Sequence, residues 1–84
     1  RYAAAIRDFD FALTIDDENA LTYFNRSVAY SYIGDYNQAI DDYTTSLKLA
    51  PASIAALRNR GLLHLRDGNY NFALKDLCIT FIAK

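Results

Sequence analysis

The sequence predicts an all-α protein built from antiparallel helix-turn-helix repeats that stack side by side as a solenoid. The segment GDYNQAI at residues 34–40 recurs as GNYNFAL at 68–74 and as YAAAI at 2–6, so related tyrosines stand 34 residues apart. A fixed period of this length is typical of repeat proteins. Apolar residues also return at three- and four-residue steps, the spacing of an amphipathic helix. Short links separate these stretches, and links of a few residues make consecutive helices antiparallel.

Residues 2–14 form the first expected helix, in which Ile6, Phe9 and Leu13 follow the helical period. The polar segment 16–19 interrupts the pattern. Its acidic residues lie just before the next helix, where the helix dipole favours negative charge. We therefore expect one residue of this segment to cap the second helix.

Residues 20–33 form the second expected helix, whose apolar residues make two stripes and so imply two packing partners. The stripes are Leu21, Phe24, Val28 and Tyr32, and Tyr23, Ser27 and Tyr30. Gly34 follows directly and is expected in the left-handed conformation that closes a helix. Asp35 can then cap the third helix.

The third helix is expected over residues 36–49, because Pro51 cannot continue it. A fourth helix is expected to start at Ile54. The chain then turns at residues 67–69 and forms a fifth helix over residues 70–83. Helices of about 12 to 14 residues are too short to be stable alone in water, so packing against neighbours has to hold them.

These boundaries make one array of about two and a half repeats. Residues 1–19 carry the second helix of a partial repeat, 20–53 a complete repeat, and 54–84 a nearly complete one. The N-terminus is expected to lie within a hairpin, as in a piece of a longer array.

The complete repeat resembles the tetratricopeptide repeat. The matching positions are Tyr23, Ser27, Tyr30, Gly34, Tyr36, Ala39, Tyr43, Ser46 and Pro51. The following unit keeps Gly61, Gly68, Tyr70 and Ala73 but has Leu57, His64 and Leu77 in place of aromatic residues. The resemblance implies a right-handed superhelix of paired helices, with a thinner aromatic core in the last unit.

Small residues are expected where the two helices of a hairpin touch. Ser27 should lie beside Ala39, and Gly61 beside Ala73, which lets the two backbones approach closely. Larger side chains at these positions would overpack the hairpin.

Two arginines stand where apolar residues are more usual, and Asp8, Asp42 and Asp76 recur at the 34-residue period. We predict that Arg26 pairs with Asp8 or Asp42, and that Arg60 pairs with Asp42 or Asp76. We interpret these as pairs that fix the register of the helices rather than as a ligand site.

The resemblance implies a concave face, lined mainly by the first helix of each hairpin, that receives an extended peptide or a helix of another protein. The residues expected there are Leu21, Phe24, Asn25, Val28, Ser31, Tyr32, Ala55, Arg58, Asn59, Leu62, Leu65 and Arg66. The two asparagines can bind a peptide backbone, and the two arginines can pair with carboxylates of the ligand.

The chaperone-binding members of the family hold a C-terminal carboxylate with lysines and an arginine placed around asparagines. Here Phe24, Val28, Ala55 and Asn59 stand where most of that charged clamp would be. The resemblance therefore does not extend to the recognition of chaperone tails.

The formal net charge of −1 argues against a protein that tracks nucleic-acid phosphates. No apolar run approaches the roughly 20 residues of a membrane helix, so membrane insertion is not expected. The charge is nevertheless uneven: residues 1–42 sum to −5 and residues 43–84 to +4. This gradient either favours head-to-tail association or an elongated charged ligand, or it is an accident of a fragment.

Catalysis is not expected, because the sequence holds no phosphate-binding glycine loop, paired catalytic carboxylates or serine-histidine arrangement. We predict no cofactor and no metal. His64 and Cys78 are expected to pack rather than react. A single cysteine favours a reducing compartment, and hence a cytoplasmic location.

The last helix is apolar on more than one side, through Leu77, Ile79, Phe81 and Ile82. A terminal repeat normally has a polar outer face, so a further helix, a second copy or a partner is expected to cover it. The predicted function is a protein-protein interaction scaffold. The alternatives are a self-assembly element that associates through its apolar ends and an accessory interaction domain of a larger enzyme.

Overall fold

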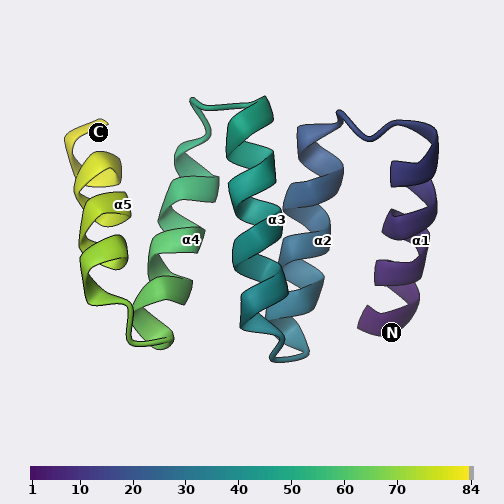
Figure 1. Cartoon of the computed structure of the whole chain (residues 1–84), viewed down its shortest axis with the longest axis horizontal. Helices are drawn as coiled ribbons and strands as arrows, with labels where there is room; N and C mark the ends of the chain where they lie inside the picture. The colour runs from purple at the N-terminus through teal and green to yellow at the C-terminus, as the bar shows by residue number, and fades with distance from the viewer. Residues whose placement is uncertain (84) are drawn as a thin grey trace.

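Five helices lie side by side in chain order, each antiparallel to the next, in a computed structural model of the chain (Figure 1). The helices are α1 (Tyr2–Ile15), α2 (Ala20–Tyr32), α3 (Tyr36–Leu49), α4 (Ile54–Arg66) and α5 (Tyr70–Ala83). The structure describes residues 1–83, and the side chains of residues 1–80. The stack measures 35 × 24 × 16 Å, and each helix packs on its neighbours in sequence. The predicted all-α repeat solenoid is confirmed.

The predicted caps are present at the helix starts. The side chain of Asn19, from the polar segment, accepts hydrogen bonds from the backbone N–H groups of Leu21 and Thr22 at 3.0 and 3.2 Å. Asp35 accepts one from the N–H of Gln38 at 3.4 Å. These bonds satisfy amide groups that have no partner within the helix, and so they fix where α2 and α3 begin.

Gly34 closes α2 with a φ of +87°, the left-handed conformation that the sequence predicted. The helix nevertheless ends at Tyr32, one residue earlier than expected. The N–H of Ile33 bonds to the carbonyls of both Ala29 and Tyr30 as the chain turns, which tightens the last turn before the glycine. The end of α1 also differs from its prediction, because this helix extends to Ile15, one residue beyond the predicted end.

The helices of each hairpin touch at small residues. Ser27 is fully buried, and its Oγ donates a hydrogen bond to the carbonyl of Ala39 at 2.6 Å, as the predicted contact requires. In the next hairpin, a Cβ added to Gly61 would lie 2.9 Å from Cγ of Leu77 and 3.1 Å from Cβ of Asp76. The nearest neighbours of Gly61 are therefore one turn beyond the predicted Ala73, and they leave no room for a side chain.

An arginine fixes each hairpin through both oxygens of one carboxylate. Nε and Nη2 of Arg26 each donate to Asp42 at 2.8 Å, and the same nitrogens of Arg60 donate to Asp76 at 2.8 and 2.9 Å. Both aspartates are only 4% exposed. Bidentate pairing compensates these buried carboxylates and sets the register of the two helices.

The second partner of Arg26 is Asp10, whose Oδ1 accepts from Nη1 at 2.8 Å, so the alternative pairing with Asp8 was wrong. Two residues on a helix differ by about 200° in direction, which places Asp8 on the far side of α1. At the equivalent place in the next repeat, Nη1 of Arg60 donates to Oγ1 of Thr44 at 3.2 Å. The hydrogen bonds with Asp42 raise the pKa of Arg26 above its usual value, so this arginine stays charged.

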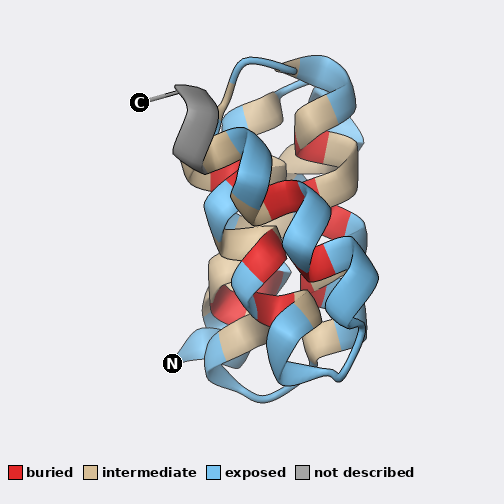
Figure 2. Ribbon diagram, turned by 90° about the vertical axis from the view of Figure 1, so that its left-hand side faces the viewer, coloured by how far each residue is buried: buried red, intermediate tan, exposed pale blue. Residues whose placement is uncertain are grey.

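The core runs along the middle of the stack, and exposed residues cover its outside (Figure 2). Tyr43 is 2% exposed and meets the ring of Phe24 edge-on at 5.4 Å. His64 stacks on Phe72 with ring centroids 5.4 Å apart, which confirms that it packs. Its Nδ1 is buried and has no hydrogen-bond partner among the described residues.

Cys78 is exposed, so the prediction that it packs was wrong. It lies on the side of α5 that faces away from α4, where Tyr70 and Leu74 are also more than 60% exposed. Of the apolar residues predicted to leave this end uncovered, Ile79 is 44% exposed and Leu77 is half-buried. Phe81 and Ile82 lie outside the described side chains.

Enlarging the small residue at the hairpin contact should destabilise the fold. Ser27→Leu adds volume where the helices touch and removes the bond to the Ala39 carbonyl, so it should cost about 1 to 3 kcal/mol of unfolding free energy. A thermal melt measures the loss. Asn25→Leu, on the exposed side of the same helix, is the matched control and should melt like the wild type. Equal melting temperatures for the wild type and Ser27→Leu would contradict the close contact.

Alkaline pH should weaken the fold through Tyr43. Burial raises the pKa of Tyr43 above its usual value, because the folded state disfavours the charged phenolate. The stabilisation this gives is complete below about pH 10 and is lost as pH rises through 10 toward the folded-state pKa. Urea unfolding at about pH 8 and about pH 11 should show a larger alkaline loss for the wild type than for Tyr43→Phe.

Tyr70→Phe is the control for this measurement, since it removes the same hydroxyl group from a side chain that is 67% exposed. It should retain the full alkaline loss of the wild type. An identical alkaline loss in Tyr43→Phe and the wild type would overturn the assignment of this effect to Tyr43.

Candidate functional site

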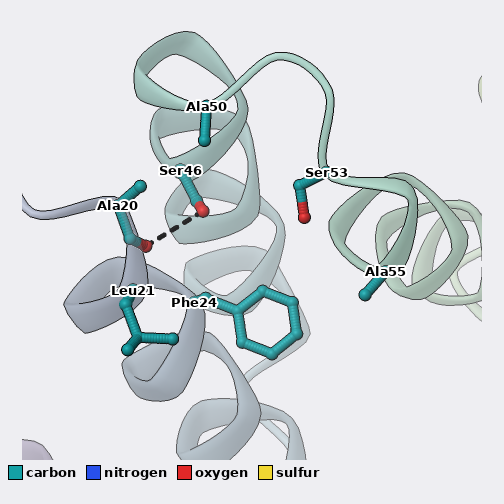
Figure 3. Close-up of a pocket in the computed structure, with 7 residues that line it drawn as sticks. All are labelled: Ala20, Leu21, Phe24, Ser46, Ala50, Ser53 and Ala55. Carbon is teal, nitrogen blue, oxygen red and sulfur yellow. Dashed lines mark hydrogen bonds between the residues drawn. The ribbon is translucent and has the colours of Figure 1, made fainter.

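Two pockets lie along the seam between α2 and α4. The larger has a volume of about 380 Å³ and lies where these two helices start and α3 ends (Figure 3). The smaller, of about 230 Å³, lies between the second half of α2 and the middle of α4. We call this surface the α2–α4 groove, and it belongs to the first helices of the two hairpins, as the predicted binding face does.

The larger pocket is an apolar surface. Its lining residues are Ala20, Leu21, Phe24, Ser46, Ala50, Ser53 and Ala55. Its two hydroxyl groups are already used within the chain. Oγ of Ser46 donates to the carbonyl of Ala20 at 3.0 Å, and Oγ of Ser53 accepts from the N–H of Ala56 at 3.2 Å as the cap of α4. The pocket therefore suits an apolar side chain.

The smaller pocket mixes polar and apolar groups. Its lining residues are Val28, Ser31, Tyr32, Tyr43, Asn59, Leu62 and Leu63. Nδ2 of Asn59 donates to Oη of Tyr43 at 3.2 Å, which orients the amide. This is the one side-chain hydrogen bond of Asn59 within the described part of the chain, so the rest of the amide can bond to a ligand.

The ring of Tyr32, which lines the smaller pocket, is held in place by a residue outside the groove. It stacks on Tyr2 of α1, with ring centroids 4.9 Å apart and planes 9° apart. Although 67% exposed, Tyr32 is therefore positioned by a neighbour rather than free to turn.

The predicted binding residues divide into three sets. Leu21, Phe24 and Ala55 line the larger pocket, and Val28, Ser31, Tyr32, Asn59 and Leu62 line the smaller one. Outside both pockets are Asn25, Arg58, Leu65 and Arg66, all exposed. The guanidinium of Arg66 lies 5.1 Å from the ring centroid of Tyr36, a cation–π contact, whereas Arg58 makes no ion pair within the described chain.

Several lining residues were missed because the sequence pattern was read only on the first helix of each hairpin. Ser46 and Ala50 come from the end of α3, and Ser53 from the link into α4. The Ala50–Pro51 boundary was the available signal, because it brings the end of α3 beside the starts of α2 and α4.

No acidic residue is among those lining either pocket. Within the residues that the structure describes, no three His, Cys, Asp or Glu side chains gather as a metal site would require. None of the described helices has both the length and the apolar character needed to cross a membrane.

Known proteins are similar to this chain in sequence and in fold. The chain is 29% identical over 76 residues to the tetratricopeptide repeat and J domain-containing co-chaperone DNJ1 of Cryptococcus neoformans var. grubii, covering 90% of this chain. It is 31% identical over 75 residues to serine/threonine-protein phosphatase 5 of Homo sapiens, covering 89% of this chain. The matched region spans only 15% of each of these relatives.

Among solved structures, the second tetratricopeptide repeat domain of Spaghetti (RPAP3), bound to the HSP90 peptide SRMEEVD, superposes with a TM-score of 0.92. It is 29% identical, and the match covers 99% of this chain and 77% of that one. The family model of the tetratricopeptide repeat matches residues 20–53, the repeat that the sequence predicted as complete. One helix before this unit and one helix hairpin after it continue the same fold. The chain belongs to the tetratricopeptide repeat family.

Proposed function

We propose that the chain is a protein-protein interaction module whose α2–α4 groove binds a peptide segment of another protein. The observation that carries this proposal is the larger pocket, an apolar hollow whose two hydroxyl groups each form a hydrogen bond within the chain. Such a pocket is stabilised by taking up an apolar side chain. A tetratricopeptide repeat domain of similar structure was solved with a peptide bound, which supports a peptide as the kind of ligand.

The polar groups of the groove indicate what else the peptide carries. Asn59 offers the free part of its amide to a peptide main chain. Arg58 is exposed on the same helix and can bind a carboxylate of the ligand. The proposed ligand is thus a segment with an apolar anchor and an acidic residue near it.

The HSP90 peptide of the similar structure is not the ligand we propose here. Phe24 and Ala55, at two positions where the chaperone-binding members have their charged clamp, line the apolar pocket. A terminal carboxylate there would lose its hydration without gaining a cation.

A second candidate function is end-to-end self-assembly. It is favoured by the exposed Tyr70 and Leu74 on α5 and by opposite net charge in the two halves of the sequence. As a third possibility, the similarity to a protein phosphatase fits an accessory interaction domain within a larger enzyme. In each case we assign no chemistry to this chain. The free thiol of Cys78 fits the cytoplasmic location that we also propose.

Peptides selected from a random library on the immobilised chain should lose affinity when the groove is altered. Leu21→Arg and Leu62→Arg replace side chains that are 65% and 50% exposed, so the fold should survive. Losing the burial of one such side chain should weaken binding by about tenfold or more in calorimetric titration. Phe11→Arg, at a 67% exposed position of α1 outside the groove, is the control. Full binding by both groove variants would overturn the proposal, and concentration-dependent sedimentation of the wild type would support self-assembly.

The peptide SRMEEVD should bind at least about tenfold more weakly than the selected peptides, because the pockets lack a cation for its terminal carboxylate. An amidated form of the same peptide is the control and should bind no differently. A marked preference for the free carboxylate would show that the clamp exists despite the altered residues.

A further inference from the structure

The two pockets of the α2–α4 groove follow one another along a pair of parallel helices. α2 and α4 run in the same direction, because α3 between them is antiparallel to both (Figure 1). Residues 20–24 of α2 line the larger pocket and residues 28–32 line the smaller one, so the lining shifts by eight residues. A helix rises about 1.5 Å per residue, and the pockets are therefore about 12 Å apart along the groove.

Two aromatic rings separate the pockets. Phe24 lines the larger pocket and Tyr43 the smaller, and their rings meet edge-on with centroids 5.4 Å apart. The ring of Phe24 projects from α2 toward α4 (Figure 3), and Tyr43 is held in the core at 2% exposure. We call this pair the aromatic wall. One side chain cannot fill both pockets across it, so a ligand that uses both has to place one side chain on each side.

We propose that the groove selects an extended peptide with two apolar side chains four residues apart and a small residue midway between them. This inference rests on the proposed function, because it specifies the ligand of the same groove. An extended chain advances about 3.3 Å per residue and its side chains alternate between two sides, so positions i and i+4 lie on one side about 13 Å apart. Positions i and i+2, only about 7 Å apart, are too close to reach both pockets. Position i+2 of the ligand lies over the aromatic wall and has to be small.

The polar groups of the smaller pocket favour an extended peptide over a helix. A helix could also bridge about 12 Å, with apolar side chains eight residues apart. Its main-chain groups, however, already bond to one another along the helix. The amide of Asn59 has hydrogen-bonding capacity beyond its bond to Tyr43 within the described chain. An extended ligand supplies the free N–H and C=O groups that this amide can bind.

Arg58 selects the charge of the residues between the two apolar ones. On α4 the lining residues Ala55, Asn59 and Leu62 follow the i, i+4, i+7 spacing of one helix face. Arg58, at i+3, lies on the same face at a level between the pockets, and it is exposed. Ligand positions i+1 and i+3 point away from the pockets, toward the rim of the groove. An acidic residue there can bind the guanidinium of Arg58, which makes no ion pair among the described residues.

The test uses capped peptides with the core Leu-Asp-Ala-Asp-Leu, which presents the same side chains in either direction along the groove. On titration into the full chain, the backbone amide signals of Leu21, Ala55 and Leu62 should shift together in nuclear magnetic resonance spectra. Deleting the alanine or adding a second one changes the leucine spacing to three or five residues. Either change should weaken binding by about tenfold or more, because only one leucine is then buried. Phenylalanine in place of the alanine should weaken binding as much, because it meets the aromatic wall.

A second set of variants tests the charge. Asparagine in place of both aspartates should weaken the binding of the peptide to the wild type, but not to Arg58→Gln, because the pair is already absent there. Lys48→Gln removes the same charge at an exposed position of α3 and is the matched control. It should distinguish the two peptides as the wild type does.

The outcomes separate this inference from the proposed function. Equal affinity for the three leucine spacings, no binding by the core peptide, or tighter binding by a helical peptide with leucines eight residues apart would each overturn the inference. Signal shifts at Leu21 without shifts at Leu62 would do the same. In these cases the groove remains the peptide site if library-selected peptides still lose affinity for Leu21→Arg and Leu62→Arg. Full binding of those peptides by both variants would overturn the proposed function as well.

Discussion

The fold depends on the close approach of the two helices within each hairpin. A buried carboxylate is unfavourable unless its oxygens are satisfied, and here one arginine satisfies both oxygens from sixteen residues earlier in the chain. The arginine can reach the aspartate only when the backbones are near, which the small residue beside it permits. Because both hairpins use the same spacing, both adopt the same geometry, and units of the same shape stack into a solenoid.

The groove follows from this geometry rather than from residues set aside for binding. Once α2 is fixed against α3, the three-residue link after Ala50 places the start of α4 next to the start of α2. Ser46 and Ser53 are then consumed in stabilising that junction, one by bonding to the first residue of α2 and the other by capping α4. The space left over is apolar, and it suits a side chain from another protein.

The repeat period and the helical spacing made most of the architecture predictable. They predicted the five helices, a cap within residues 16–19 and another at Asp35, and Asp42 as one of two alternative partners of Arg26. The repeat period did not predict which neighbour a side chain faces, because it shows only that positions in different repeats are equivalent. Asp8 recurs at the 34-residue period and Asp10 does not, yet the rotation of α1 brings Asp10 rather than Asp8 to Arg26. The pockets were partly missed for a similar reason, since their walls come from helix ends that meet only after the chain has turned.

Contacts of the arginine–aspartate pair within the hairpins are the same in both repeats, whereas contacts between hairpins differ. Between hairpins the contacting positions are equivalent but the side chains differ. Tyr2 stacks on Tyr32, whereas the equivalent Tyr36 makes a cation–π contact with Arg66. Arg26 pairs with Asp10 of α1, whereas Arg60 bonds to Thr44 at the equivalent position of α3. The seams between hairpins therefore accept different side chains without loss of the fold. Both pockets of the groove lie across such a seam, between the hairpin of α2 and α3 and the hairpin of α4 and α5.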